Sequence, residues 1–310
     1  YVREARAAYR FLAATQYPDG GFACERRAGK VVNSSRESNH AAYLATGLWQ
    51  LHTALPDPDF LAEMWPALSR AIDFVVRLQE PGGEISWAVD PEGRVWRSPL
   101  LTGSSSVHGS LVCAVRIAER LGHSRPAWRE ALRRLGDALR FDMGRFHASD
   151  LPEPQGRHSM DWYYPVLGGA LRDAPGRERL LDQEQTETFL EEGVGCKCVR
   201  DRPWYTIAET CELVLALDAV GLTARAREIA SWVGSLRHEN GAYWTGATHP
   251  EKIIYPEGEQ TPWTGATVLL ADDALADDSP TSDFFRSLAG DDLDDRASIA
   301  DEDDAALPEG

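Results

Sequence analysis

The sequence predicts an all-α fold, an (α/α) toroid (a double-walled α/α barrel) of five to six helix pairs. Three observations lead to this prediction. One short motif recurs at the ends of helical runs, a second and more apolar helical run follows each copy, and the runs before the copies are amphipathic. Repeats of this size indicate helical hairpins that bury their apolar faces only by stacking or by closing into a ring.

Each copy of the motif begins where a helical run ends in Gln or Arg. A Gly follows four residues later, and a ring or large apolar side chain two residues after it. The copies are Gln16-Gly20-Phe22, Gln79-Gly83-Ile85, Arg140-Gly144-Phe146 and Arg237-Gly241-Tyr243. Apolar pairs such as Phe11-Leu12 lie about one helical turn upstream, on a shared face. The long interval before Gly241 leaves room for a degenerate unit, which we place at 193–195.

The runs that follow each copy open with polar or ring residues and become small and apolar. They begin at residues 39, 106, 161, 205 and 261. The intervening runs, such as 128–134, carry the Arg and Glu of a solvated face. Buried runs that alternate with amphipathic ones predict an inner and an outer wall of helices.

The acidic residues are concentrated at the C-terminal end. The formal net charge is −17, and residues 272–310 hold 14 acidic residues against 2 arginines. We therefore expect residues 1–271 to form the toroid domain and residues 272–310 an acidic, disordered tail, because the tail lacks apolar residues for a core.

Composition limits the partners. The acidic balance gives no electrostatic support for nucleic-acid binding, and no apolar stretch reaches the length of a transmembrane helix. Five Cys are an odd number that fits reduced thiols. We expect a cytoplasmic protein without a cofactor; association with a membrane surface and the oligomeric state stay open.

The first turns of the inner helices are expected to converge on one cavity at one rim. Asp161 and Glu209 are the candidate acid and base, with His108 as a third catalytic candidate. The candidate substrate-binding residues are His40, Tyr163, Tyr164, Trp204, Glu257, Glu259 and Trp263. The alternatives are that the two carboxylates only cap helices and that the histidines serve packing.

The motif at residues 11 to 22, with its copies, resembles the QW repeat of the terpenoid toroids, the superfamily of squalene cyclases and protein prenyltransferase β subunits. The resemblance implies that the Gln ties neighbouring helix ends, and that the substrate is an isoprenoid.

The family's zinc ligands are not matched, since Asp201 is followed by Arg and Pro rather than by a Cys two residues on. Cys196, Cys198 and Cys211 could form a thiolate site for a metal, but we favour the interpretation that they are ordinary reduced cysteines. The cyclase motif DxDD occurs at 292–295, but in the acidic tail, where chance matches are common.

The leading expectation from this resemblance is an enzyme of the prenyltransferase or terpene-cyclase type, a transferase or cyclase for a long apolar substrate. An α/α barrel lined by Trp and two carboxylates also suits sugars, so a glycan hydrolase or lyase is the first alternative. A non-catalytic binding toroid is the second. The expected partner in each case is a small molecule, either an isoprenoid or a glycan.

Overall fold

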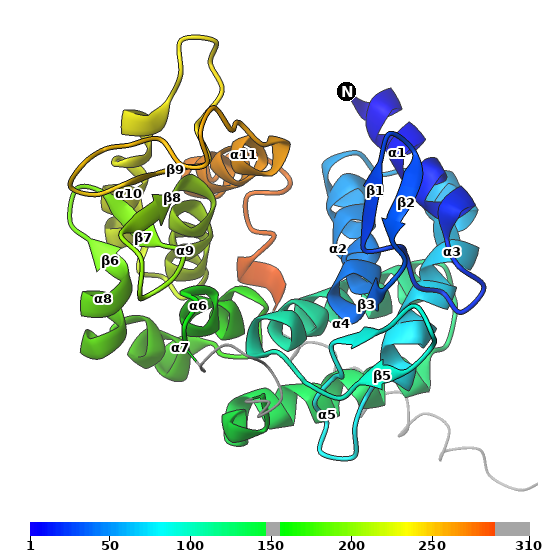
Figure 1. Ribbon diagram of the computed structural model, residues 1–310. Coiled ribbons are helices and arrows are strands. Elements are labelled where there is room, and N and C mark those ends of the chain that lie inside the picture. The colour runs from blue at the N-terminus through cyan, green and yellow to red at the C-terminus, as the bar shows by residue number, and fades with distance from the viewer. Residues whose placement is uncertain (147–155, 289–310) are drawn as a thin grey trace, which may run out of the picture.

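The computed structural model describes residues 1–146 and 156–288, and these residues form successive outer and inner helices (Figure 1). The outer helices are α1 (Val2–Thr15), α3 (Pro58–Arg77), α5 (Pro126–Phe141), α7 (Asp173–Leu180), α8 (Gln183–Phe189) and α10 (Thr223–Ala230). The inner helices are α2 (Ser38–Ala54), α4 (Leu101–Arg120), α6 (Met160–Leu167), α9 (Ile207–Ala219) and α11 (Pro262–Ala276). The predicted alternation of two walls is therefore present.

The inner helices pack on one another in chain order. Helix α2 contacts α4, α4 contacts α6, α6 contacts α9, and α9 contacts α11. Figure 1 shows the resulting arc, with α1 to α3 on the right, α4 and α5 below and α9 to α11 on the left.

The long connections all lie before inner helices, and they contain short antiparallel strands. Strands β1 (Glu25–Arg27) and β2 (Lys30–Asn33) form a hairpin, and β3 (Arg36–Glu37), β4 (Ala88–Val89) and β5 (Val95–Trp96) form a small sheet. A four-stranded sheet holds β6 (Leu190–Glu191), β7 (Gly195–Lys197), β8 (Trp204–Thr206) and β9 (Gly246–Thr248). The helical class is confirmed, but the expectation of a purely α protein missed these strands, which are too short to show a period of two.

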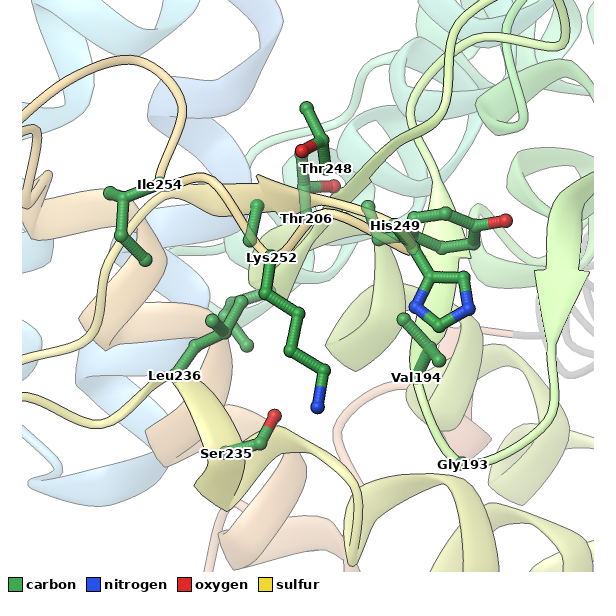
Figure 2. A pocket seen from close by; sticks show the side chains of 12 residues that line it. Gly193, Val194, Thr206, Ser235, Leu236, Thr248, His249, Lys252 and Ile254 are labelled. Atoms are coloured by element: carbon green, nitrogen blue, oxygen red, sulfur yellow. The ribbon is translucent and has the colours of Figure 1, made fainter.

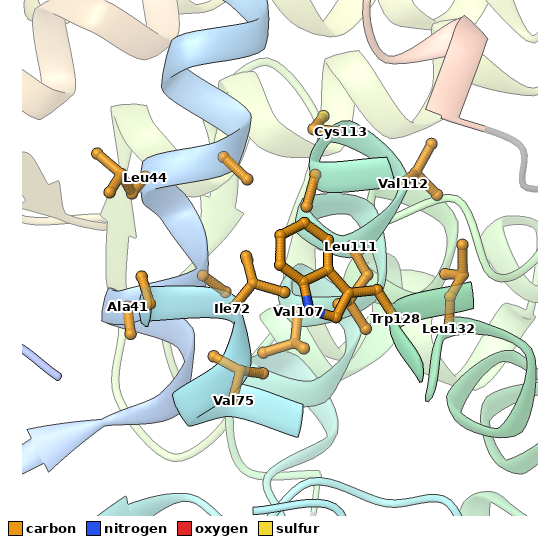
Figure 3. Close-up of a cluster of buried hydrophobic side chains, with 14 of the residues drawn as sticks. Ala41, Leu44, Ile72, Val75, Val107, Leu111, Val112, Cys113, Trp128 and Leu132 are labelled. Atoms are coloured by element: carbon orange, nitrogen blue, oxygen red, sulfur yellow. The ribbon is translucent and has the colours of Figure 1, made fainter. Parts of the chain in front are cut away.

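The main core lies between α2, α3, α4 and α5. Figure 3 shows the ring of Trp128 among aliphatic side chains that include Ile72, Val107 and Leu111. The indole nitrogen of Trp128 donates to Oδ1 of Asp73 over 2.7 Å, so its polar atom is satisfied. A second cluster fills the space between α6, α9 and α10.

The two Gln copies of the motif connect α1 to α3 and α3 to α5. Nε2 of Gln16 donates to the carbonyl oxygens of Gly20 and Ala67, each at 2.9 Å. Nε2 of Gln79 donates to the carbonyl oxygens of Gly83 and Ala131 at 2.9 and 2.8 Å. In both copies one amide bonds its own turn and a carbonyl of the following outer helix, so the motif is a structural tie.

The Gly of the motif is required by close backbone contact. Gly83 has φ 100°, and a Cβ there would lie 2.3 Å from the carbonyl oxygen of Arg134. Gly93, in the turn between β4 and β5, has a similar φ of 89° with nothing within 4 Å of the added atom. Gly93 therefore serves as a control for backbone strain alone.

We expect Gly83→Ala to destabilise the fold more than Gly93→Ala. Both variants incur the cost of a left-handed residue, about 1–2 kcal/mol, whereas only Gly83→Ala adds a clash, which costs roughly 1–3 kcal/mol more. Urea unfolding followed by circular dichroism measures both. Equal losses in the two variants would show that contact with Arg134 does not constrain this position.

The segment after α11 packs against both cores. Phe284 and Leu288 are buried in the first cluster, and Phe285 contacts both clusters. Nη1 of Arg286 lies 2.9 Å from Oδ2 of Asp218 on α9, and Nη2 of Arg116 on α4 donates to the carbonyl oxygen of Ser287 over 2.6 Å. The segment thus bridges the two halves of the arc.

The boundary predicted after residue 271 falls inside α11. The DxDD string at 292–295 lies outside the described residues, as does the rest of the chain after residue 288, so the proposed division into two domains remains a prediction. No helix within the described ranges is long and apolar enough to span a bilayer.

Candidate active site

The first turn of α9 holds Glu209 at the rim. Strand β8 leads directly into the helix, and Thr206 is the N-cap residue with φ −123° and ψ 148°. The hydroxyl of Thr206 donates to Oε2 of Glu209, an arrangement related to a capping box. The half-buried carboxylate is therefore held in one orientation at the start of an inner helix.

Glu212 lies one turn further along the same face of α9. The hydroxyls of Tyr163 and Tyr164 donate to its two carboxylate oxygens over 2.8 and 2.9 Å. Burial and the nearby charge of Glu209 raise the pKa of Glu212 to about 7, although the two tyrosine hydrogen bonds oppose the shift. The two glutamates are thus neighbours in different environments.

A cavity of about 270 Å³ lies between the inner helices and is bordered by Glu212, one turn from Glu209. It is lined by Tyr43 of α2, Ser106 of α4, Tyr164 of α6, Glu212 of α9 and Thr267 of α11, together with other residues of these helices. Phe285 and Leu288 from the C-terminal segment also contribute. Tyr43 is 41% exposed because it faces this space rather than a packed core.

The loop between β7 and β8 joins the beginnings of α6 and α9. The backbone nitrogen of Ser159, the N-cap residue of α6, donates to the carbonyl oxygen of Cys198 over 3.1 Å. Burial and the neighbouring Glu209 carboxylate raise the pKa of the Cys198 thiol. Cys198 therefore borders the candidate site as a neutral thiol.

Glu259 lies beside the start of α9. The hydroxyl of Thr245 donates to Oε1 of Glu259 over 2.9 Å, and the carbonyl oxygen of Thr245 accepts from the backbone nitrogen of Ile207 over 3.1 Å. Thr245 therefore connects Glu259 to the turn that presents Glu209. Both carboxylates are half-buried.

Asp161 starts α6 as expected, but it faces a different space. Its Oδ1 accepts from the hydroxyl of Thr102 over 2.8 Å, and Arg179 donates to its carbonyl oxygen over 2.7 Å. With Trp162 and Arg179 it lines a pocket of about 580 Å³ among α5, α6, α7 and α8. In the part of the chain that the structure describes, no hydrogen bond or ion pair joins it to Glu209.

His108 does not lie at the rim. It is 1% exposed, and its Nδ1 pairs with the carbonyl oxygen of Gly168 over 2.8 Å. Burial lowers the pKa of His108 to about 4, so the ring is neutral at physiological pH. This environment matches the alternative of a packing histidine, because α4, α5 and α6 enclose the ring.

The other predicted residues are distributed along the rim and the cavity. Tyr163 and Tyr164 bond Glu212, whereas Trp204 donates from Nε1 to the carbonyl oxygen of Tyr255 over 2.9 Å. Trp263 is 62% exposed and Glu257 is also exposed. His40 lies at the start of α2, 3.5 Å from Glu37.

A further pocket of about 490 Å³ lies beside the four-stranded sheet (Figure 2). Lys252, His249 and Ser235 contribute polar groups, and Figure 2 shows the Lys252 amine directed toward Ser235. The residues that line this pocket include no Asp or Glu. It therefore offers no carboxylate for acid–base chemistry, in contrast to the region around Glu209.

Sequence reasoning missed Glu212 and Tyr43. Both lie within segments that the sequence predicts to be buried helices, and nothing in the sequence assigns a function to a polar side chain there. The available signal was spacing, because Glu212 follows Glu209 by three residues and so lies on the same helical face.

Several solved structures share this fold, whereas no family model matches the chain. A D-mannose isomerase has a TM-score of 0.63 at 10% identity, covering 89% of this chain and 84% of that one. A sugar epimerase from a ruminal bacterium has a TM-score of 0.62 at 10% identity, with coverages of 93% and 84%. A glycosidase variant in complex with glucose has a TM-score of 0.58 at 15% identity, with coverages of 89% and 79%. At these identities the likeness shows the shared fold alone.

A known protein is similar in sequence as well. MMP endo-(1,4)-3-O-methyl-alpha-D-mannosidase of Mycolicibacterium hassiacum is 44% identical over 287 residues, which are 93% of this chain and 77% of that protein.

The resemblance to terpenoid toroids was therefore wrong, as was the expectation of a prenyltransferase or terpene cyclase for an isoprenoid. The sequence relative is a mannosidase, and the solved neighbours are sugar isomerases, epimerases and glycosidases. The glycan-active alternative agrees better with these findings. The motif did not identify the family, because its Gln has a packing role, which is to bond the next outer helix, and this role is not specific to terpenoid toroids. The chain belongs to the family of the MMP endo-(1,4)-3-O-methyl-alpha-D-mannosidase of Mycolicibacterium hassiacum.

Proposed function

We propose that this protein is a glycan hydrolase that cleaves internal bonds of a (1,4)-linked 3-O-methyl-α-D-mannose chain. The observation that carries the proposal is the 44% identity to an enzyme named for that activity, across 93% of this chain. The half-buried Glu209 at the start of α9 supports it, as does the cavity lined by Tyr43 and Tyr164 that Glu212 borders one turn away.

Glu209 is the catalytic carboxylate in this proposal, and Glu259 is its partner. In the hydrolysis of a glycosidic bond, one carboxylic acid protonates the leaving oxygen. A second carboxylate either attacks the anomeric carbon or deprotonates the attacking water. The bond between the anomeric carbon and the leaving oxygen breaks, and water supplies the new hydroxyl and the proton. Thr245 holds Glu259 beside the turn that carries Glu209, which favours this pair over Asp161 and Glu209.

Glu212 is a positioning residue. It lies below Glu209 and is bonded by two tyrosines, so it fixes the cavity wall and adds a charge that varies near neutral pH. Glu212 would affect the reaction indirectly, because its charge changes the electrostatic environment of Glu209.

The cavity chemistry fits a methylated sugar. Tyr43, Tyr164, Leu167, Leu215 and Leu270 give it a largely apolar lining, which suits methyl groups and the faces of sugar rings. A methyl group in an apolar pocket changes specificity by about 10- to 200-fold.

We expect the purified protein to cleave 3-O-methylated α-(1,4)-mannose oligosaccharides at least about tenfold faster than the unmethylated chains. Mass spectrometry of early products measures both the rate and the position of cleavage. Internal cleavage yields shorter oligosaccharides before monosaccharide accumulates. Turnover of neither substrate would contradict the proposal, and tight binding without turnover would support the non-catalytic toroid.

A further inference from the structure

A cluster of metal-binding side chains lies at the start of α2, apart from the carboxylates of α9. Sγ of Cys24, a carboxylate oxygen of Glu37 and a ring nitrogen of His40 all lie within 4.8 Å of one another. Sγ of Cys24 is 3.0 Å from Oε1 of Glu37, and Nε2 of His40 is 3.5 Å from Oε2 of Glu37. We propose that these three residues bind a divalent transition metal such as Zn²⁺.

The donor spacing matches tetrahedral zinc coordination. Zinc bonds of about 2.0–2.3 Å to sulfur, nitrogen and oxygen place the donors roughly 3.3–3.8 Å apart at tetrahedral angles. The separations of 3.0 and 3.5 Å end on different oxygens of Glu37, and all three donors lie within 4.8 Å, so side-chain rotations are needed to bring them onto one ion. Three protein donors leave a fourth position for water or another ligand.

The backbone holds the three donors before any metal arrives. Glu37 belongs to β3, is the N-cap residue of α2, and pairs with Ala88 of β4. His40 follows in the first turn of the same helix. Cys24 is fixed by a hydrogen bond of 2.8 Å from its backbone nitrogen to the carbonyl oxygen of Ser35. The site therefore joins the loop after Phe22 to the start of an inner helix.

The charge and softness of the donors favour zinc over magnesium or calcium. A thiolate and an imidazole select transition metals, whereas Mg²⁺ and Ca²⁺ prefer oxygen ligands alone. On binding, the metal–sulfur bond replaces the thiol proton of Cys24, which leaves to solvent, and no electron is transferred. Two anionic ligands and a divalent ion then give a neutral centre.

The other cysteines do not offer an equivalent site. Cys196 and Cys211 are buried and Cys198 is half-buried. Among the residues that the structure describes, the donor atoms of three His, Cys, Asp or Glu residues come this close only at Cys24, Glu37 and His40. The sequence-based expectation of no metal considered the zinc ligands expected near Asp201 and the three later cysteines, but not Cys24.

Cobalt titration tests the proposal on the full chain. We expect one equivalent of Co²⁺ to produce thiolate-to-cobalt charge-transfer absorption, and one equivalent of Zn²⁺ to be retained against a chromophoric chelator. Cys24→Ser should abolish the absorption, and His40→Ala should weaken metal affinity by at least about tenfold. His40 is 43% exposed in its side chain, so its removal leaves the core untouched.

Cys198→Ser is the matched control, because it removes another thiol that is not fully buried, and it should leave the absorption unchanged. Absence of the absorption and of zinc retention in the wild type would overturn the proposal. So would absorption that survives in Cys24→Ser and disappears in Cys198→Ser. Melting curves provide a second measurement, since Zn²⁺ should raise the Tm of the wild type and not that of Cys24→Ser.

Discussion

Glu209→Gln is expected to reduce turnover of the methylated mannose chain by about 10²- to 10⁴-fold, the usual contribution of a general acid or base. The swap keeps the shape of the side chain and its contact with Thr206 but removes the titrating group. The cost in stability should be small, about 0.5–2 kcal/mol at most, as for a weakened cap. Steady-state kinetics and a melting curve on the same preparation separate the two effects.

Two further variants identify the second carboxylate. Glu259→Gln should lower kcat to a similar degree, whereas Asp161→Asn should have little effect because Asp161 lines another pocket. A large loss in Asp161→Asn with normal activity in Glu259→Gln would restore the predicted pairing of Asp161 with Glu209. Full activity in Glu209→Gln would exclude it from the chemistry and leave it as a capping residue.

Glu212→Gln is expected to change how stability depends on pH. The pKa of Glu212 is raised to about 7 in the folded state, from an ordinary value near 4.3 when unfolded. Between these values the folded chain binds more protons than the unfolded chain, so the free energy of unfolding falls as pH rises through this window. At 1.36 kcal/mol per pKa unit the full penalty above pH 7 is about 4 kcal/mol.

Removal of the carboxyl group removes this penalty. The variant should gain stability relative to the wild type between pH 5 and pH 8, and urea unfolding at both pH values measures the gain. Glu209→Gln is the internal control: it removes the nearby charge that helps to raise the Glu212 pKa, so it should move the pH window downward. Parallel pH profiles for wild type and Glu212→Gln would contradict a raised pKa at this position.

The repeat and the alternation of helices were predictable because their causes are local. Gln79 and Gly83 occupy fixed positions relative to a helix end, and the next outer helix supplies the carbonyl oxygens of Ala131 and Arg134. The same local character explains the wrong family. The spacing of Gln and Gly indicates how neighbouring helix ends pack. It does not indicate the reaction, because unrelated rings of helical hairpins can pack in the same way.

The candidate site was predictable only in part. Glu209 lies in the first turn of an inner helix as expected, because helix starts can be read from sequence, and its catalytic role remains a prediction. The face on which a side chain falls depends on the rotation of its helix, which only packing sets, so Asp161 bonds Thr102 instead of facing Glu209. The position of Cys24, whose Sγ lies within 4.8 Å of a ring nitrogen of His40, likewise depends on how a loop folds over α2.

The bridge formed by residues 284–288 also has a consequence for synthesis of the chain. Phe284 and Leu288 complete the first core while Arg286 pairs with Asp218 in the second half. A ribosome delivers these residues only after every helix of both halves has been made. The two halves can therefore begin to fold and to pack through α4 and α6 during translation, but the contacts of this segment with both halves form only after it has emerged from the exit tunnel.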